Sequence, residues 1–296
     1  MILTIGDSVC WGQGLAEAHK FDCLYAKAKA LPFTRIAHSG AIIGAKTDSS
    51  PEVEVGEVPV GSPTVWQQVL APRDWSQIDL VLLNGGINDI SVTRILSPWT
   101  NTSQLKHWID QFCNQAMAAL LTAAVGQLTA PGARIAVLGY YPILSSQSGG
   151  SETQMRSLLE VYGVATSSVI AQNQFSFSAL IPTIVNNCIT FWNCSNAALQ
   201  TAVNTANAAV KKTVCTFVPL PFTEANAMWA PQSLLWQLNA LLLPEDEVSG
   251  PREKACEALY GDVVHIPQWI QCARASAGHP DIKGAQAITD ALVAAL

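Results

Sequence analysis

The sequence is poor in charge of either sign. Lys and Arg together number 16 among 296 residues, against 22 Asp and Glu, so the formal net charge is −6. Binding to a nucleic-acid backbone or to anionic lipid headgroups depends on clustered Lys and Arg. No basic run occurs in the chain. The sequence therefore predicts no nucleic-acid partner.

Long apolar segments are also missing. No uninterrupted apolar stretch approaches the roughly 20 residues that a membrane-spanning helix requires, so no integral membrane segment is expected. The chain opens on the strand-like MILTI instead of a charged and then apolar leader, which argues against a signal peptide in this chain. We expect a soluble protein, and the compartment stays open.

Signatures of metal and dinucleotide sites are absent as well. The five histidines are scattered, no HExxH occurs, and no Cys/His set has the spacing of a zinc site. Gly85-Gly86 and Gly12-x-Gly14 lie outside any GxGxxG context, which a dinucleotide fingerprint needs. The sequence therefore predicts neither a metal nor a cofactor.

The cysteines leave the redox state open. The chain contains eight, none in a CxxC pair. An even number is compatible with disulfides in a secreted mature protein, whereas buried thiols also pack as small apolar side chains. Two pairs are close enough in sequence to be candidate disulfides: Cys188 with Cys194, and Cys256 with Cys272.

Short apolar runs alternate with longer helix-forming segments. Runs that end at Gly, Pro or a polar residue are typical of parallel strands buried on both faces; they lie at 1–5, 34–38, 78–86, 133–144 and 213–222. Helical patterns cover 103–128, 151–174, 195–213 and 281–296. This alternation predicts an α/β fold, a three-layer α/β/α sandwich with a mainly parallel, flavodoxin-like sheet of about five strands.

The length and the 49% apolar composition support one domain over residues 1–296 with a large buried core. The region at about 222–271 is less regular and rich in Trp, Leu and Pro. We interpret it as an elaboration between the last core strand and the terminal helix. Within it, the stretch PQSLLWQLNALLL at 231–243 is expected to form a helix that covers either the core or a bound ligand.

Ser8 follows the first predicted strand in the stretch GDSVCWGQG. A serine in a tight turn between a strand and a helix can expose its hydroxyl at the sheet edge, where it can act as a nucleophile. Asp and Ser are also favoured as helix caps for purely structural reasons. Taken alone, the stretch leaves both interpretations open.

Four short motifs, in order, resemble the SGNH (GDSL) family of serine esterases and lipases. They are Gly6-Asp7-Ser8, Gly40 in HSGAIIG, Gly86-Ile87-Asn88-Asp89, and His279-Pro280. The resemblance covers residues 1 to about 144, the strand near 214 and the last 20 or so residues. It implies an enzyme that hydrolyses carboxylic esters without a cofactor.

The resemblance also implies a role for each matching residue. Ser8 would be the nucleophile, and an oxyanion hole would be formed by the N–H groups of Ser8 and Gly40 and the side-chain amide of Asn88. Glycine lets its backbone approach a ligand closely, and an amide donates without changing its protonation state, so these residue types suit the task. Asp7, although adjacent to Ser8, is expected to have a structural role.

His279 would be the general base, since an imidazole with an unperturbed pKa of about 6.5 transfers protons readily near neutral pH. Among the other histidines, His38 ends the second predicted strand two residues before Gly40. We therefore expect His38 to orient this loop or to contact substrate.

The sequence departs from the family just before His279. Many members have an Asp three residues before the histidine, where it orients the imidazole; here this position is Ser276. We expect a Ser8–His279 dyad in which the Ser276 hydroxyl or a backbone carbonyl orients the ring. Asp281 and Asp262 are weaker candidates for the same task.

The expected substrate is a small-molecule ester, and the apolar elaboration around Trp229 and Trp236 suggests a lipid or acyl chain. Carbohydrate O-deacetylation and acyl transfer to an alcohol are alternatives at the same site. A non-catalytic protein that binds acylated ligands is a further alternative, motivated only by the missing Asp.

Overall fold

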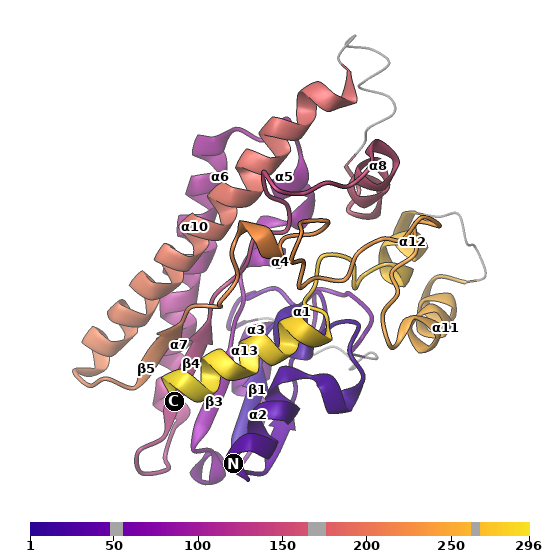
Figure 1. Cartoon of the computed structure of the whole chain (residues 1–296). Helices are drawn as coiled ribbons and strands as arrows, with labels where there is room; N and C mark the ends of the chain where they lie inside the picture. The colour runs from indigo at the N-terminus through magenta and orange to yellow at the C-terminus, as the bar shows by residue number, and fades with distance from the viewer. Residues whose placement is uncertain (48–55, 165–175, 262–266) are drawn as a thin grey trace.

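The computed structural model describes residues 1–47, 56–164, 176–261 and 267–296. Five parallel strands form one sheet in the order β2-β1-β3-β4-β5. The strands are β1 Ile2–Ile5, β2 Phe33–Arg35, β3 Leu80–Leu83, β4 Arg134–Leu138 and β5 Cys215–Val218. The predicted fold class is confirmed, since helices cover both faces of this sheet (Figure 1).

The first group of helices follows the strands along the chain. These are α1 Ser8–Trp11, α2 Phe21–Lys29, α3 Val65–Leu70, α4 Ile87–Ile90, α5 Val92–Leu96, α6 Thr102–Ile109 and α7 Met117–Gln127. A π-helical segment, Asp110–Ala116, joins α6 to α7, so the helix predicted over 103–128 is continuous.

The second group is α8 Glu152–Val161, α10 Phe177–Val210, α11 Ser249–Tyr260, α12 Pro267–Ala273 and α13 Ile282–Ala295. Single 3₁₀ turns occur at Glu17–His19, Trp75–Gln77 and Glu224–Asn226. Helices α2 and α13 pack together on one face of the sheet. Because parallel crossovers are right-handed, the strand order puts α3, α7 and α10 on the other face.

The core forms where the sequence is continuously apolar. All four residues of β1 and all four of β3 are buried. These two strands are neighbours at the centre of the sheet, with Ile2 beside Leu80 and Ile5 beside Leu83. In a parallel sheet all strands end at one edge, so the turns after β1, β3 and β4 converge there.

The helix expected over 231–243 is wrong. Pro231 and Pro244 bound the stretch, and its first part pairs with a distant segment, with Leu235 bridged to Pro280. Trp236 N–H donates to the His279 carbonyl at 2.8 Å, and Gly278 N–H donates to the Trp236 carbonyl at 2.9 Å. The stretch is therefore not helical, and the part around Trp236 lies directly against the loop that carries His279.

One of the two candidate disulfides is present. Cys256 on α11 is bonded to Cys272 on α12, and these two helices lie side by side, away from the sheet (Figure 1). Cys188 and Cys194 are not bonded, because both lie within α10 and six residues on a helix separate their side chains around its axis. That pairing is therefore wrong.

Candidate active site

The turn after β1 places the Ser8 side chain at the carboxyl edge of the sheet. Gly6 has φ 134°, and a Cβ there would lie 2.6 Å from the Asn84 carbonyl oxygen, so only glycine fits. Asp7 then caps the short helix α1 by accepting a hydrogen bond from Val9 N–H at 2.9 Å. Ser8 is the first residue of α1 and is 5% exposed. The capping role that the sequence suggested thus belongs to Asp7.

Ser8 and His279 are 271 residues apart in sequence and in direct contact in the fold. The Nε2 atom of His279 lies 2.7 Å from Ser8 Oγ. This is the distance at which an imidazole can accept the hydroxyl proton. The geometry is that of a nucleophile and its base.

The environment keeps the imidazole neutral. The pKa of His279 is lowered from 6.5 to about 4, mainly by burial and also by the nearby Arg252 guanidinium. The backbone of Ser276 and Ala275 and the carboxylate of Asp246 act in the opposite direction. At neutral pH the ring is therefore uncharged and able to accept a proton.

No described side chain holds the other ring nitrogen. The Nδ1 atom of His279 is buried and makes no hydrogen bond of ordinary geometry within the described residues. Asp281 instead caps α13, accepting from Gly284 N–H at 2.8 Å. The hydroxyl of Ser276 donates to Asp246. The backbone of Ser276 and Ala275 is near enough to raise the pKa of the ring.

The three residues expected to supply oxyanion donors, Ser8, Gly40 and Asn88, line one cavity. Neither Ser8 N–H nor Gly40 N–H donates to any described backbone or side-chain acceptor. The Asn88 amide donates to the Ala41 carbonyl at 3.0 Å, which leaves its second N–H unused. All three residues line the same cavity as His279.

Close packing explains the glycine at position 40. Its φ is 76°, and a Cβ would lie 2.7 Å from Val60 N and 2.8 Å from the Pro59 carbonyl carbon. Any side chain at this position would displace the 59–60 backbone, which lines the cavity. Only glycine therefore fits at position 40, because of its positive φ and because no room is left for a Cβ.

Two further side chains hold these donors together. Asp89 accepts from Ile43 N–H at 2.8 Å, which ties the loop after Gly40 to α4. The Tyr140 hydroxyl donates to Asp7 at 2.8 Å and accepts from Ile87 N–H at 3.2 Å. Tyr140 therefore connects the nucleophile turn with the turn that carries Asn88.

Asp7 is fully buried, and burial raises its pKa to about 6, although Val9 N–H and the Tyr140 hydroxyl lower it. Its two carboxylate oxygens are used by these two donors. This supports the structural role expected for Asp7.

The cavity has a volume of about 310 Å³. Its lining includes Ser8, Gly40, Asn88 and His279. The rest of the lining is mainly apolar or aromatic: Ile42, Pro59, Val60, Ile87, Val92, Tyr140, Tyr141, Ile143 and Tyr162. Such a site suits a substrate with one reactive polar group and an apolar substituent.

Two residues singled out in the sequence lie elsewhere. His38 is buried and its Nδ1 lies 2.8 Å from the Ser39 carbonyl oxygen. It lines a second cavity, together with Trp11 and Ile36, and does not line the one that holds Ser8. A direct contact of His38 with substrate bound at Ser8 is therefore not supported. Asp262 lies outside the described residues.

Sequence reasoning missed Tyr140, Asp246 and Arg252. Tyr140 follows β4 at the sheet edge where Ser8 and Asn88 also lie, so its position after a predicted strand was an available signal. Asp246 and Arg252 lie in the irregular elaboration, where no motif or periodicity indicated a role.

The described residues contain no group of three or more His, Cys, Asp or Glu side chains arranged to hold a metal ion. Within the same part of the chain, no helix has both the length and the apolar character to cross a bilayer.

The sequence matches no protein-family model, and no curated protein matches it. Solved structures are similar in three dimensions. Phospholipase A1 from Streptomyces albidoflavus NA297 aligns over 99% of this chain and 98% of its own, with 14% identity and a TM-score of 0.53.

Two esterases align at lower scores. A family two carbohydrate esterase from Clostridium thermocellum, in complex with cellohexaose, has 13% identity and a TM-score of 0.46, covering 99% of this chain and 62% of that one. An acetyl xylan esterase (Est2A) from the rumen bacterium Butyrivibrio proteoclasticus has 12% identity and a TM-score of 0.44, covering 100% and 62%. The chain thus spans less than two thirds of these two enzymes. With the strand order and the full-length match to the phospholipase, the resemblance found in the four motifs is confirmed at the level of architecture: the chain has the fold of the SGNH (GDSL) hydrolases.

Proposed function

We propose that the protein is a carboxylic ester hydrolase that works through an acyl-enzyme on Ser8. The observation that carries this proposal is the 2.7 Å contact between Ser8 Oγ and His279 Nε2, in a cavity that Gly40 and Asn88 also line. A nucleophile, a neutral base and oxyanion donors are the groups that acyl transfer requires.

In the first half-reaction, Ser8 Oγ bonds to the acyl carbon while its proton passes to His279 Nε2. The carbonyl oxygen becomes an oxyanion, which the N–H groups of Ser8, Gly40 and Asn88 stabilise. The C–O bond to the alcohol then breaks, and the imidazolium returns the proton to the leaving alkoxide.

In the second half-reaction, His279 takes a proton from water, and the hydroxide attacks the acyl carbon. The Ser8–acyl bond breaks, Ser8 Oγ recovers the proton, and the carboxylic acid leaves. An alcohol bound in place of water would give acyl transfer with the same residues.

The base works as a dyad with Ser8 in this proposal. A carboxylate normally fixes the imidazole tautomer and stabilises the imidazolium. Here we infer that the backbone of Ser276 and Ala275, which raises the pKa of His279, orients the ring with less charge stabilisation than a carboxylate would give.

The cavity suggests esters of short or medium acyl chains. Its volume of about 310 Å³ lies at the lower end of the range for ligand sites, and a long chain would extend beyond it. Each methylene that still fits contributes about 0.8 kcal/mol, or roughly fourfold in kcat/KM. With p-nitrophenyl esters from acetate to palmitate, we expect kcat/KM to rise and then level off. A sharp preference for acetate would favour the deacetylase alternative, and a rise continuing to palmitate would favour a lipid substrate.

The direct test is hydrolysis of p-nitrophenyl acetate and octanoate by the wild type and by Ser8→Ala. We expect the substitution to lower kcat by about 10⁴-fold or more. Ser145→Ala is the matched control, since Ser145 is a buried serine that donates to the Glu224 carbonyl and lies outside the cavity. An inactive wild type that binds these esters would favour the non-catalytic alternative, whereas full activity in Ser8→Ala would refute the proposal.

A further inference from the structure

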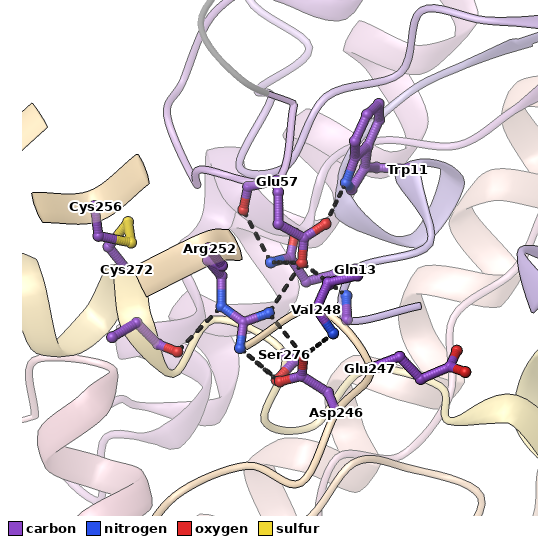
Figure 2. Close-up of polar contacts among 12 residues, drawn as sticks. Trp11, Gln13, Glu57, Asp246, Glu247, Val248, Arg252, Cys256, Cys272 and Ser276 are labelled. Carbon is purple, nitrogen blue, oxygen red and sulfur yellow. Dashed lines mark hydrogen bonds and ion pairs between the residues drawn. A yellow bond between two sulfur atoms is a disulfide. The ribbon is translucent and has the colours of Figure 1, made fainter. Parts of the chain in front are cut away.

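The most connected buried charge in the described part of the molecule is Arg252, on α11. Its side chain is 0% exposed. The guanidinium donates to Glu57 at 3.0 Å, to both oxygens of Asp246 and to the Ala273 carbonyl at 3.0 Å (Figure 2). A contact of 3.4 Å also reaches the Ser276 hydroxyl.

We call Arg252, Glu57 and Asp246 the buried charge cluster. Its Glu57 side contacts the end of α1 and the residues just after it. Glu57 accepts from Trp11 Nε1 at 2.6 Å, Gln13 Nε2 at 2.9 Å and Gly14 N–H at 2.9 Å. Trp11 is the last residue of α1, and Gln13 and Gly14 follow it. Figure 2 shows Glu57 between this segment and Arg252.

The other side contacts the loop of His279. The Asp246 side chain is 0% exposed and accepts from Arg252, from Val248 N–H at 3.0 Å and from the Ser276 hydroxyl. Ser276 is three residues before His279, and its carbonyl accepts from His279 N–H at 2.8 Å. Asp246 is therefore two hydrogen bonds from the backbone of the proposed base.

We propose that Asp246, fixed by Arg252, is a positioning residue that holds His279 against Ser8 through the Ser276 hydroxyl. The inference rests on the proposed function of the Ser8–His279 pair. It assigns a carboxylate to the histidine loop although none contacts the imidazole among the described residues.

The physical reason is that the ring has no side-chain anchor of its own. Because Nδ1 lacks a well-formed hydrogen bond, the position of Nε2 depends on the backbone of 275–279. Trp236 holds this loop from one side, and Asp246 holds it from the other through Ser276. A catalytic group displaced by about 1 Å can lower the rate by about 10²-fold.

Stability alone is a weak explanation for the cluster. Buried ion pairs are expensive to desolvate and are often no more stabilising than well-packed apolar residues. A role in stability would predict that loss of Asp246 lowers Tm without a specific effect on kcat. A positioning role predicts that kcat falls while KM stays nearly constant.

The test compares Asp246→Asn, Ser276→Ala and the double variant with the wild type. With p-nitrophenyl acetate we expect each single variant to lower kcat by about ten- to a hundredfold, with KM changed by less than about twofold. The rate of fluorophosphonate labelling of Ser8 should fall in parallel. The double variant should be no slower than Asp246→Asn, because both substitutions break the same connection.

Asp22→Asn is the matched control. Asp22 also pairs through a fully buried carboxylate with a buried arginine, Arg35, and it does not line the Ser8 cavity. We expect this variant to lose thermal stability and keep the kcat of the wild type. Ser276→Ala removes only a hydroxyl and keeps all three charges, so it tests the proposal even if Asp246→Asn does not fold.

The outcomes separate the two proposals. An active wild type with unchanged kcat in Ser276→Ala, or with additive losses in the double variant, would overturn the positioning role and leave the hydrolase intact. A wild type that neither turns over nor labels would overturn both.

Discussion

The two halves of the proposed site are built in different ways. The Ser8 half comes from short turns at the ends of neighbouring strands, where Gly6, Asp7 and Asn88 each follow a buried β-strand by a few residues. The His279 half comes from loops fixed by distant segments, with Trp236 and Asp246 as its partners. The first half is thus defined by local sequence, and the second by long-range contacts.

The largest effect should come from the base itself. His279→Ala should lower kcat for p-nitrophenyl acetate by about 10²- to 10⁴-fold, since proton transfer by a positioned base contributes this much. His38→Ala should leave kcat within about threefold, because His38 lines the second cavity. Similar losses of kcat in both variants would contradict the assignment of His279 as the specific base.

Asn88→Ala tests the strand-end half. Loss of one oxyanion donor typically lowers kcat by about 10²- to 10³-fold. The fold should tolerate the change, since the side chain makes one hydrogen bond, to the Ala41 carbonyl. The measurement is kcat and KM together with Tm; a raised KM with normal kcat would mean that Asn88 binds the ground state instead.

The pH dependence of kcat/KM tests the environment of His279 in the histidine half. Burial lowers the pKa of His279 to about 4, so the neutral base persists as the pH falls. We expect kcat/KM to stay nearly constant from pH 8 to pH 5 and to fall tenfold per pH unit below about 4. A base with an ordinary pKa of about 6.5 would already be about thirtyfold less active at pH 5. If kcat/KM of the wild type instead began to fall near pH 6.5, the result would contradict the buried environment described for the imidazole.

Reduction of the disulfide should weaken the two halves unequally. The Cys256–Cys272 bond closes a loop of 16 residues and joins α11, which carries Arg252, to α12. Opening such a loop removes about 3 kcal/mol of stability. Dithiothreitol has no other disulfide to reduce, because the remaining six cysteines are free.

Hydrogen exchange measures this difference by region. With dithiothreitol we expect faster exchange in α11, α12 and the 275–279 loop, and unchanged protection in β1 and β3. Equal loss of protection in both halves would mean that the disulfide supports the whole fold instead of the histidine half.

The strand-end half of the site was easier to predict from the sequence than the histidine half. The five strands and the strand-end motifs follow from apolar runs that end at Gly or polar residues, so positions such as Ser8 and Asn88 were predictable. Strand β2 is shorter than its apolar run, because Ile36 N–H and Ala37 N–H both donate to the Thr4 carbonyl. Local pattern was sufficient for most of the sheet.

Local pattern failed in the elaboration. The Leu-rich stretch at 231–243 has a helical composition, yet the backbone around Trp236 forms hydrogen bonds with the segment around His279. Asp246 meets Ser276 across 30 residues, and Arg252 meets Glu57 across 195. No periodicity or spacing encodes such pairings, since they depend on how the completed core brings distant segments together.

The measurement that tests the central claim most directly is peptide mapping after reaction with a fluorophosphonate. The account predicts one phosphonyl adduct, on the peptide that contains Ser8, and a labelling rate that falls sharply in His279→Ala. An adduct on another serine, or no adduct on a protein that hydrolyses esters, would contradict it.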